Sequence, residues 1–432
     1  MDAEMQAESC SVASLPDDLL CVLVPDSRVL LMARTCKRIQ RVLERGRCDV
    51  DLRVCKKVSC DLRLGNLMPR GVNSIQLNFR IRRFECIVGL RCIQIRFCDF
   101  EELTFMHLRV LRMHSNKLAD AHLLALLSMF TYSSDLRVFE FTQQTLKCRH
   151  IQLLADSIAC FPRLEVLNLH NNYFVFDSLG LVLDAVQTSS LSTLTLSSNS
   201  CEDADKTLKL CRVLRQNCNT LTSLNLSGMR LRTPEFDALV DALGACRLLE
   251  RLDLSQNHLH YGCLIQVLTA TAESPLHSFD WSGNRLGSAG TFVLASHIKH
   301  SDGWKAQLRD LKVRMCDVYH GLHHLGEALT TCTALHSLDI SSNSVYAHEV
   351  VKLMASTSLT SLNISYNNIS DYGMQLVLHR AAETTTLREL QVLGNHMSRH
   401  TIRQFRRMRA RTRVQTYIPK CPCVCNACRH AV

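Results

Sequence analysis

The sequence lacks several features that define whole classes of protein. No apolar run approaches the roughly 18 residues that a transmembrane helix requires. The N-terminus, Met1-Asp2-Ala3-Glu4-Met5, is acidic and has no apolar segment of the secretory type behind it, so we expect no secretory signal. Phosphate-loop, zinc-protease, hydrolase and dinucleotide-binding motifs are also missing. We therefore expect neither an enzyme nor a cofactor-dependent protein, and no specific nucleic-acid motif is present.

Net charge is missing from most of the chain as well. The whole sequence has 50 Lys and Arg against 40 Asp and Glu, a balance of +10. Residues 71–398 hold 29 basic and 30 acidic side chains, a balance of −1, whereas residues 28–57 carry +7 and residues 399–432 carry +9. Any general attraction for a polyanion is therefore expected only at the basic ends.

Cysteine, in contrast, is abundant, with 22 copies. Disulfides form in oxidising compartments, and the missing secretory signal argues against them here. Many of the cysteines fall at positions that the repeat pattern places in the core. We interpret these as reduced, small apolar side chains, and we expect a cytoplasmic protein, with the nucleus as the alternative.

One sequence pattern recurs along the chain. Its clearest copies are residues 249–259 (LERLDLSQNHL) and 359–369 (LTSLNISYNNI), which both fit L-x-x-L-x-L-x-x-N-x-L. The alternating apolar residues predict a short strand with one buried face. The Asn is expected to turn inward and to bond to backbone groups at the bend between successive coils. Because one unit cannot bury its apolar face alone, neighbouring units must stack.

The pattern can be followed through eleven units at a nearly constant spacing. They begin at Leu108, Leu136, Leu164, Leu191, Leu221, Leu249, Leu276, Leu308, Leu335, Leu359 and Leu387. The Asn position is filled by Asn116, Asn172, Asn199, Asn257, Asn284, Asn343, Asn367 and Asn395, and it is broken at Gln144, Met229 and Cys316. Two shorter units begin at Val72 and Leu90. A period near 28 leaves about fifteen residues after each strand, which is enough for a helix.

This pattern resembles the leucine-rich repeat, and its long period is similar to that of the ribonuclease-inhibitor-like class. Cysteines that precede the next strand are similar to those of the cysteine-containing class found in many F-box proteins; they are Cys160, Cys218, Cys246 and Cys332. The resemblance implies an α/β solenoid, a horseshoe with parallel strands on the concave face and helices on the convex face. The shorter units at the start have no room for a full helix, so we expect a helix-poor beginning.

Residues 15–48 resemble an F-box. The opening LPDDLL at residues 15–20 and the Cys-Lys-Arg at residues 36–38 match its two helices, but the usual Trp is replaced by Ile39 or Gln40. The connection around residues 24–26 is also shorter than the family's. The resemblance implies docking of apolar helices on the adaptor of a ubiquitin ligase, through Leu15, Pro16, Leu19, Leu20, Leu23 and Cys36. The alternative is a helical cap that shields the first coil of the solenoid.

The chain thus divides into six segments. They are a short tail (1–14), the F-box-like helical segment (15–48), a linker with the first strands (49–71), the repeat array (72–397), a basic cap helix (398–418) and a Cys-rich tail (419–432).

Partner-binding side chains are expected on the concave face, at the positions that flank the buried strand leucines. Central units place mostly serines there, which we expect to form part of the exposed surface. The candidate contacts are Arg112, His114, Arg251, Asp253, Asp280, Lys312, Arg314 and Tyr366. Apart from Tyr366, we expect none of the exposed aromatic clusters that dominate many protein interfaces.

The eighth unit is irregular, because it begins at Leu308, later than the regular spacing from Leu276 would place it, and carries Cys316 in place of Asn. Insertions in repeat proteins often map to binding loops. The inserted Trp304 is expected either to anchor a partner or to fold back onto the convex helices. A histidine cluster follows, but a closed zinc site needs a fourth ligand that the neighbouring sequence does not supply; the cluster consists of His320, His323 and His324.

The last segments are basic and then Cys-rich. Seven arginines lie between Arg399 and Arg413 without an acidic residue, and Ile402 and Phe405 share one helical face. This pattern predicts a capping helix; the alternatives are contact with an anionic surface, such as nucleic acid or a membrane, and a nuclear import signal. For the four cysteines Cys421, Cys423, Cys425 and Cys428 the sequence leaves three alternatives: they bind a metal such as zinc, they are S-acylated, or they stay reduced in a disordered tail.

These features lead to one main functional hypothesis and two alternatives. The resemblance implies a non-catalytic adaptor, the substrate-recognition subunit of a cullin–RING (SCF-type) ubiquitin ligase, whose concave face binds the protein to be degraded. Its partners would include the ligase adaptor and the cullin. The alternatives are a scaffold subunit of a cytoskeletal, ciliary or ribonucleoprotein assembly, and a regulator of a small GTPase, which rests on fold analogy alone.

Overall fold

The computed structural model describes most of residues 136–417 and, before residue 136, six strands and three helical residues. The gaps in the first range are 145, 173, 175–177, 187–189, 200, 202, 232–234, 355–357 and 412–413. The chain forms two compact units, Met1–Ser200 and Cys201–Val432. Short parallel strands alternate with helices in the described part of both, which is the predicted leucine-rich repeat solenoid. None of the described helices combines the length and the apolar character needed to cross a bilayer.

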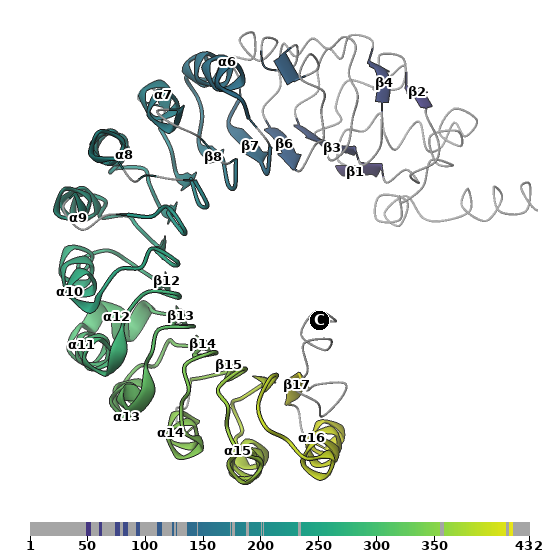
Figure 1. Ribbon diagram of the computed structural model, residues 1–432, viewed down its shortest axis with the longest axis vertical. Coiled ribbons are helices and arrows are strands. Elements are labelled where there is room, and N and C mark those ends of the chain that lie inside the picture. Colours follow the sequence, from purple (N-terminus) through teal and green to yellow (C-terminus); the bar gives the residue numbers. More distant parts are fainter. Residues whose placement is uncertain are drawn as a thin grey trace, which may run out of the picture. The chain divides into compact units, whose positions relative to one another are not determined.

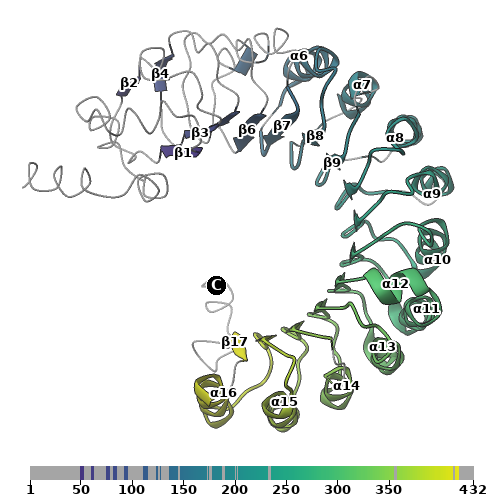
Figure 2. The same ribbon diagram turned by 180° about the vertical axis from the view of Figure 1, so that it is seen from behind.

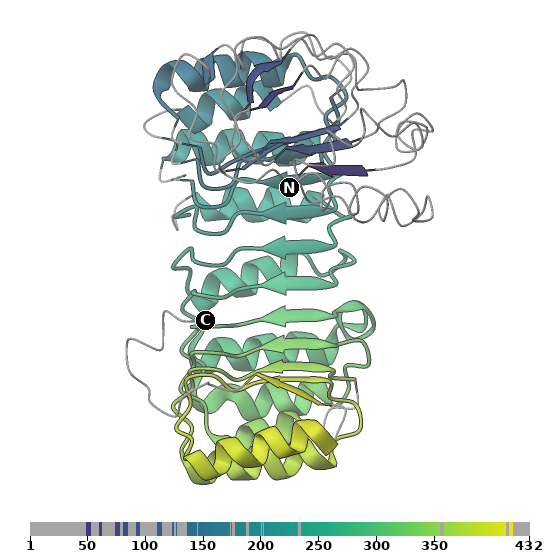
Figure 3. The ribbon, with the colours of Figure 1, turned by 90° about the vertical axis from the view of Figure 1, so that its right-hand side faces the viewer.

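The second unit is a parallel sheet with helices along one side (Figure 1). Its strands are β10 (Ser223–Asn225), β11 (Arg251–Asp253), β12 (Ser278–Asp280), β13 (Asp310–Lys312), β14 (Ser337–Asp339), β15 (Ser361–Asn363), β16 (Glu389–Gln391) and β17 (Gln415–Tyr417). They pair in chain order, each with the next. Figure 3 shows them side by side and pointing the same way, with the helices behind.

The helices of this unit follow the strands in turn. They are α8 (Ala204–Gln216), α9 (Phe236–Ala245), α10 (Tyr261–Ala270), α11 (Gly287–His300), α12 (Asp302–Gln307), α13 (Leu322–Leu329), α14 (Ala347–Leu353), α15 (Asp371–Glu383) and α16 (Arg399–Arg411), with a 3-10 turn η3 (Tyr319–Gly321) before α13. Apolar residues at helical spacing face the sheet; in α9, for example, Leu239 and Leu243 are fully buried. The core of each repeat therefore lies between its strand and its helix.

Neighbouring strands match residue for residue. Leu252 of β11 lies opposite Phe279 of β12, and both are buried, whereas the residues on either side point to the other face. A slip of one residue would exchange the buried and the polar sets, so burial fixes the register. The register of the sheet therefore decides which polar side chains become neighbours.

The length of the repeats varies while this register is kept. Ser278 and Asp310 lie opposite each other although the chain between them is longer than in a regular repeat, and the inserted residues form α12 beside α11 (Figure 2). The chain between Ser337 and Ser361 is shorter than usual, and the intervening helix α14 has only 7 residues. Length differences are thus absorbed by the helical side.

The Asn of the pattern turns inward, as predicted. Asn257 Nδ2 donates to the carbonyl oxygens of Leu226 (2.9 Å) and Leu254 (2.8 Å), and its Oδ1 accepts the N–H of Leu231 at 3.4 Å. One side chain thereby joins the turns of two successive repeats. The other described members bond to two carbonyls in the same way; they are Asn172, Asn199, Asn284, Asn343, Asn367 and Asn395.

Of the two alternatives predicted for Trp304, the structure shows the second: the side chain folds inward, is fully buried and packs on Phe279 and His297, with ring centroids 5.5 Å and 4.9 Å away. The expectation for the cysteines is corrected in part. Of the cysteines that precede a strand, Cys246 and Cys332 are buried, but Cys160 is exposed and Cys218 is half-buried. The helical turn before each strand faces solvent in part, so this position does not always lie in the core.

The first unit has the same construction in its described part. Its sheet has the order β1 (Asp49–Leu52), β3 (Ser74–Leu77), β5 (Cys92–Ile95), β6 (Val110–His114), β7 (Val138–Thr142), β8 (Val166–Asn168) and β9 (Thr193–Thr195), with helices α6 (Cys148–Ala159) and α7 (Ser178–Ala185). Two further strands, β2 (Cys60–Leu62) and β4 (Ile81–Phe84), pair with each other. Because β4 lies between β3 and β5 in the chain, this shorter unit has a strand where later repeats have a helix.

The end of the described chain forms a helix and one more strand. In α16, Ile402 and Phe405 are buried, whereas Arg399, Arg403 and Arg406 are exposed. The helix is followed by β17, which pairs with β16 and which the sequence pattern did not reveal. The side chains of residues 408–413 lie outside the described part of the structure.

Candidate protein-binding face

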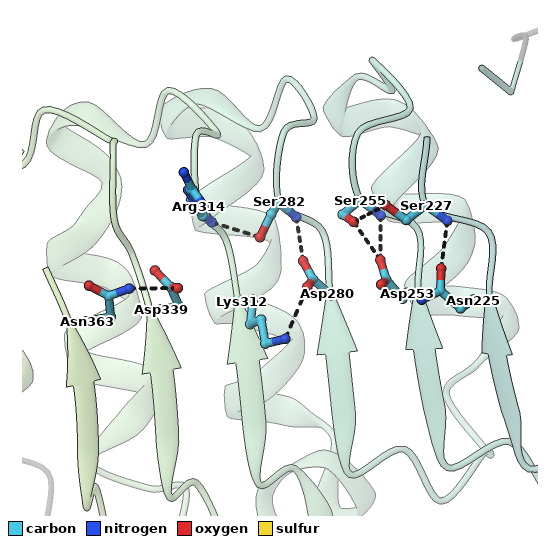
Figure 4. A network of polar contacts seen from close by, with 10 residues as sticks. All are labelled: Asn225, Ser227, Asp253, Ser255, Asp280, Ser282, Lys312, Arg314, Asp339 and Asn363. Carbon is cyan, nitrogen blue, oxygen red and sulfur yellow. Dashed lines mark hydrogen bonds and ion pairs between the residues drawn. The ribbon is translucent and has the colours of Figure 1, made fainter. Parts of the chain in front are cut away.

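The strand face is the side of the second unit's sheet that the helices do not cover. In each strand the first and third residues project toward this side, because the middle residue is buried. The register therefore places Asn225, Asp253, Asp280, Lys312, Asp339 and Asn363 in one row across six strands (Figure 4). This row is the centre of the candidate site.

Each acid or amide of the row also bonds to its own chain. The Asp253 carboxylate accepts the backbone N–H of Ser255 at 3.0 Å, and Asp280 accepts that of Ser282 at 2.9 Å. The same bond, from a Ser N–H two residues later, forms at Asn225, Asp339 and Asn363. A short side chain with an acceptor oxygen is what this turn requires, so the third position of the strand contributes to the fold as well as to the surface.

The serines that follow the row are not exposed contacts, contrary to expectation. Ser255, Ser282 and Ser341 are buried. The Ser282 hydroxyl accepts the N–H of Arg314 from the next repeat at 3.1 Å, and Ser255 Oγ lies 2.7 Å from Asp253 Oδ1. These hydroxyls form hydrogen bonds within the turns. The side chains available to a partner are therefore the acids, amides and bases of the strands.

The charges of the row are partly paired. Lys312 Nζ lies 3.5 Å from Asp280 Oδ2, and Asn363 Nδ2 donates to Asp339 Oδ2 at 2.9 Å. Burial, together with the neighbouring Asp280 carboxylate, raises the pKa of Asp253 above its usual value, although its bonds to Ser255 act in the opposite direction. The row is therefore a preorganised polar surface in which the Asp253 carboxylate has few solvent contacts.

Two arginines on this face are exposed and unpaired. Arg251 is the first residue of β11, and Arg314 follows β13 by two residues. Neither guanidinium forms an ion pair or hydrogen bond with a described residue, whereas Lys312 between them in the chain is paired. A guanidinium carries five donors in a rigid fork that suits carboxylates, so these two side chains offer the strongest free contacts of the face.

Tyr366 lies at the edge of the strand face, in the turn after β15. Its backbone is left-handed, with φ of 57°, and it is 37% exposed. Its ring crosses Gly394 of the next repeat so closely that a Cβ at position 394 would collide with it. Gly394 thus allows the ring to lie flat, and the exposed side of Tyr366 extends the polar face with an aromatic surface.

The remaining predicted site residues are placed differently. Arg112 and His114 belong to β6 in the first unit, but their side chains lie outside the described part. The F-box-like residues Leu15, Pro16, Leu19, Leu20, Leu23 and Cys36 and the tail cysteines Cys421, Cys423, Cys425 and Cys428 also lie outside the described residues. Among the residues that are described, no three His, Cys, Asp or Glu side chains are grouped so as to hold a metal ion.

Three members of the central row, Asn225, Asp339 and Asn363, were not predicted from the sequence. Each is the third residue of its strand, as Asp253 and Asp280 are. Aligning the repeats on that position would have revealed them, because the Ser two residues later is shared by all five. These residues can therefore be found by comparing the same position in every repeat, but not by inspecting residues one at a time.

One stretch of the chain matches the model of a known family. Residues 355–378 match the family model described as leucine-rich repeat. Among solved structures, the chain is similar to the leucine-rich repeat-containing protein LegL7 from Legionella pneumophila, with 19% identity and a TM-score of 0.42 over 65% of this chain and 89% of that one. No curated protein sequence matches the chain. The family match covers one repeat, and the described strands and helices have the leucine-rich repeat fold.

Proposed function

We propose that the chain is a non-catalytic adaptor that binds a protein ligand on the strand face of its second unit. This proposal rests on the exposed guanidinium groups of Arg251 and Arg314, which pair with none of the described residues and lie beside a row of acids and amides held by the turns. Such a face offers donors and acceptors at regular strand spacing. A folded protein or an extended peptide bearing carboxylates opposite the two arginines fits this arrangement.

We propose further that residues 15–48 connect this ligand to a cullin–RING ubiquitin ligase. The support is their resemblance to an F-box, which would dock an apolar helix pair on the ligase adaptor. The two ends of the chain would then divide the work, with substrate held by the repeats and ubiquitin chemistry performed by partners. A scaffold role in a larger assembly is the outcome if this connection is absent.

The strand-face proposal is tested by site-specific crosslinking. A benzoylphenylalanine is placed in the full-length chain at position 223 or 278, the residues paired with Arg251 on the neighbouring strands, or at Ile265, an exposed residue of α10, as the control. The strand-face positions should form one common protein adduct in cells, identified by mass spectrometry, that position 265 does not form. Absence of an adduct from 223 and 278, or the same adduct from all three, contradicts the proposal.

The ligase proposal has its own test. The tagged full-length protein is purified from cells beside a Leu19→Asp/Leu20→Asp variant and a control, Leu248→Asp, which changes an exposed leucine elsewhere. Circular dichroism verifies that the variants fold. Adaptor and cullin should co-purify with the wild type and the control but not with the double variant. If the wild type captures no adaptor, or if the double variant unfolds, residues 15–48 are a cap and the scaffold role is favoured.

A further inference from the structure

The helix α16 presents a face of a single charge sign. In its described part, Arg399, Arg403, Arg406 and Arg407 are exposed, and at roughly 100° per residue they fall within a sector of about 100°. None of the four guanidinium groups forms an ion pair or hydrogen bond with a described residue. No acidic residue follows Glu389 in the sequence. We call these four arginines the α16 basic face.

The α16 basic face is unfavourable for the helix itself. Arg403 lies four residues from both Arg399 and Arg407, and like charges at this spacing repel and destabilise a helix. In the neighbouring helix α15, by contrast, Glu383 follows Arg380 by three residues and pairs with it at 3.3 Å. A helix that closes a solenoid needs a polar outer face, but not one of a single charge sign. The arrangement therefore indicates a partner that supplies negative groups.

The neighbouring carboxylates compensate only part of this charge. Asp371 of α15 accepts the N–H of Ser398 at 2.6 Å and places one negative charge at the start of α16. Glu383 is the other acid of α15, and Arg380 is its arginine. The charged side chains of α15 thus sum to −1, against +4 for the α16 basic face, so a net charge of +3 remains for a ligand.

The side chains of α16 favour a charged ligand over an apolar one. Ile402 and Phe405 are buried within the unit, so the helix has no free apolar face to insert into a lipid surface. Among the described side chains of α16, no aliphatic, phenyl or indole group is exposed that could anchor a folded protein. Contacts made only by arginines are typical of a phosphate backbone.

The spacing along α16 suits successive phosphates. Four helical residues rise about 6 Å. Arg399, Arg403 and Arg407 therefore present guanidinium groups at intervals comparable with the separation of neighbouring phosphates on an extended strand. A guanidinium donates to phosphate oxygens through its rigid fork. The row can consequently follow one strand of a nucleic acid.

Aromatic side chains lie at the start of the row. Gln375 Nε2 lies 3.4 Å from Thr401 Oγ1, so the beginnings of α15 and α16 are side by side. They carry Tyr372, which is 72% exposed, and His400, which is also exposed. Unpaired bases stack on such rings, whereas the base pairs of a duplex stack on each other. The combination of arginines and rings favours a single strand.

We propose that the α16 basic face binds the backbone of single-stranded nucleic acid, and that Tyr372 and His400 offer surfaces on which unpaired bases stack. Recognition is independent of base sequence, because phosphates and the faces of the bases are common to all sequences. The proposal does not depend on the ligand of the strand face, since α16 belongs to the row of helices on the other side of the sheet (Figure 1).

The test is binding of a fluorescent oligouridylate of about 20 nucleotides to the full-length protein between about 50 and 200 mM salt. One variant removes three charges from the face, Arg399→Gln/Arg403→Gln/Arg407→Gln. A second variant keeps the charge, Arg399→Lys/Arg403→Lys/Arg407→Lys. The matched control removes three charges from exposed positions elsewhere in the unit, Arg212→Gln/Arg215→Gln/Arg285→Gln. All the changed residues are exposed, so every variant should keep the wild-type circular dichroism spectrum.

The Gln variant of α16 should lose at least tenfold in affinity. The slope of log K against log salt should become shallower by about 2, because each phosphate contact on a single strand contributes about 0.7. The Lys variant and the control should bind within about threefold of the wild type. Tyr372→Ala should weaken binding of the single strand about fivefold and leave binding of a DNA duplex unchanged.

The proposal is overturned if the wild type does not bind the oligouridylate, or if the Gln variant of α16 and the control lose affinity equally. A Lys variant that binds as weakly as the Gln variant also contradicts it, because charge would then not be what binds. Vesicles containing phosphatidylserine, or polyglutamate, that bind more tightly than the oligouridylate through the same arginines would assign the face to a membrane or to an acidic protein instead. A duplex bound more tightly than the single strand overturns it too.

Discussion

The turns at Asn257 and Cys316 occupy the same place in two repeats of the second unit, yet they are held together differently. Asn257 donates to two carbonyls and accepts an N–H from the preceding turn. Cys316 offers one thiol, 3.4 Å from the Trp281 oxygen and 3.3 Å from that of Arg314. A thiol is a weak donor and cannot replace a carboxamide. The repeat pattern therefore tolerates a missing amide where other contacts compensate.

The compensation at Cys316 comes from backbone and from aromatic packing. The N–H of Leu286, whose counterpart Leu259 donates to an Asn side chain, donates to the carbonyl of Cys316 at 3.2 Å. Both tryptophans of the chain, Trp281 and Trp304, are fully buried in the same region. Regular turns are thus stabilised by the amide of their own Asn. The irregular turn lacks this donor and depends on backbone hydrogen bonds, on Asn343 of the next repeat and on apolar burial beside it.

The largest effect is expected when the aromatic packing of the irregular repeat is removed. Trp304→Ala should lower the free energy of unfolding by about 4 kcal/mol, because a large ring is lost and a cavity remains. Urea unfolding followed by circular dichroism measures this. The exposed Tyr372→Ala is the control and should stay within about 0.5 kcal/mol of the wild type. Equal stabilities of the two variants would show that α12 does not support this repeat.

Removing a regular amide should have a slightly smaller effect. Asn257→Ala leaves the carbonyl of Leu226 and the N–H of Leu231 without their amide partner in a buried site, whereas the carbonyl of Leu254 keeps the amide of Asn284. The loss should cost about 3 kcal/mol. The same urea titration applies, with Asn219→Ala at an exposed turn as the control. A loss no greater than that of the control would mean that the inward Asn is dispensable.

Introducing an Asn into the irregular turn tests whether the missing amide makes this turn less stable than a regular one. Cys316→Asn replaces a weak thiol donor by an amide beside the carbonyls of Trp281 and Arg314. These carbonyls already accept Asn284 Nδ2 and the N–H of Gly283, so we expect a gain of only about 0.5 kcal/mol. Burial raises the pKa of the Cys316 thiol to about 12, so the wild-type side chain is neutral and no charge is lost in the exchange. A destabilised variant would indicate that the turn has adapted its shape to sulfur.

The smallest effect concerns the row on the strand face, where the regular repeat has Asp253 and the irregular one Lys312. Burial, and then the Asp280 carboxylate, raise the pKa of Asp253, so the folded state binds its proton more tightly than the unfolded state. Its ionisation therefore lowers stability as the pH rises from about 4 toward neutrality. Asp253→Asn should flatten the pH dependence of unfolding and should not destabilise the protein at pH 7. A steeper profile would contradict this assignment.

The sequence predicted the repeat but not every role within it. Strand positions and the inward Asn follow from a pattern that local geometry dictates, and the structure confirms them. The sequence could not decide whether Trp304 is exposed or buried, because it lies in an inserted segment that has no equivalent in the other repeats. Only the packing in the folded structure shows that it points inward. The serines were misjudged for a related reason: their alternation predicts exposure, whereas their hydroxyls satisfy the backbone of the following turn.

The candidate site was predicted in part. Arg251, Asp253, Asp280, Lys312 and Arg314 were recognised because charged residues interrupt a row of serines. Asn225, Asp339 and Asn363 were not recognised, because only the pairing of neighbouring strands places them in one row with those charged residues.

The most direct test of the central claim is the affinity of the strand face for the partner that crosslinks to it. Binding of that partner to the full-length protein is compared with binding to Arg251→Glu/Arg314→Glu and to Arg212→Glu, an exposed arginine of α8. We predict that the double variant loses at least tenfold in affinity, about 1.4 kcal/mol, while Arg212→Glu binds like the wild type. Equal affinities for the two variants would contradict the assignment of the strand face as the ligand-binding surface.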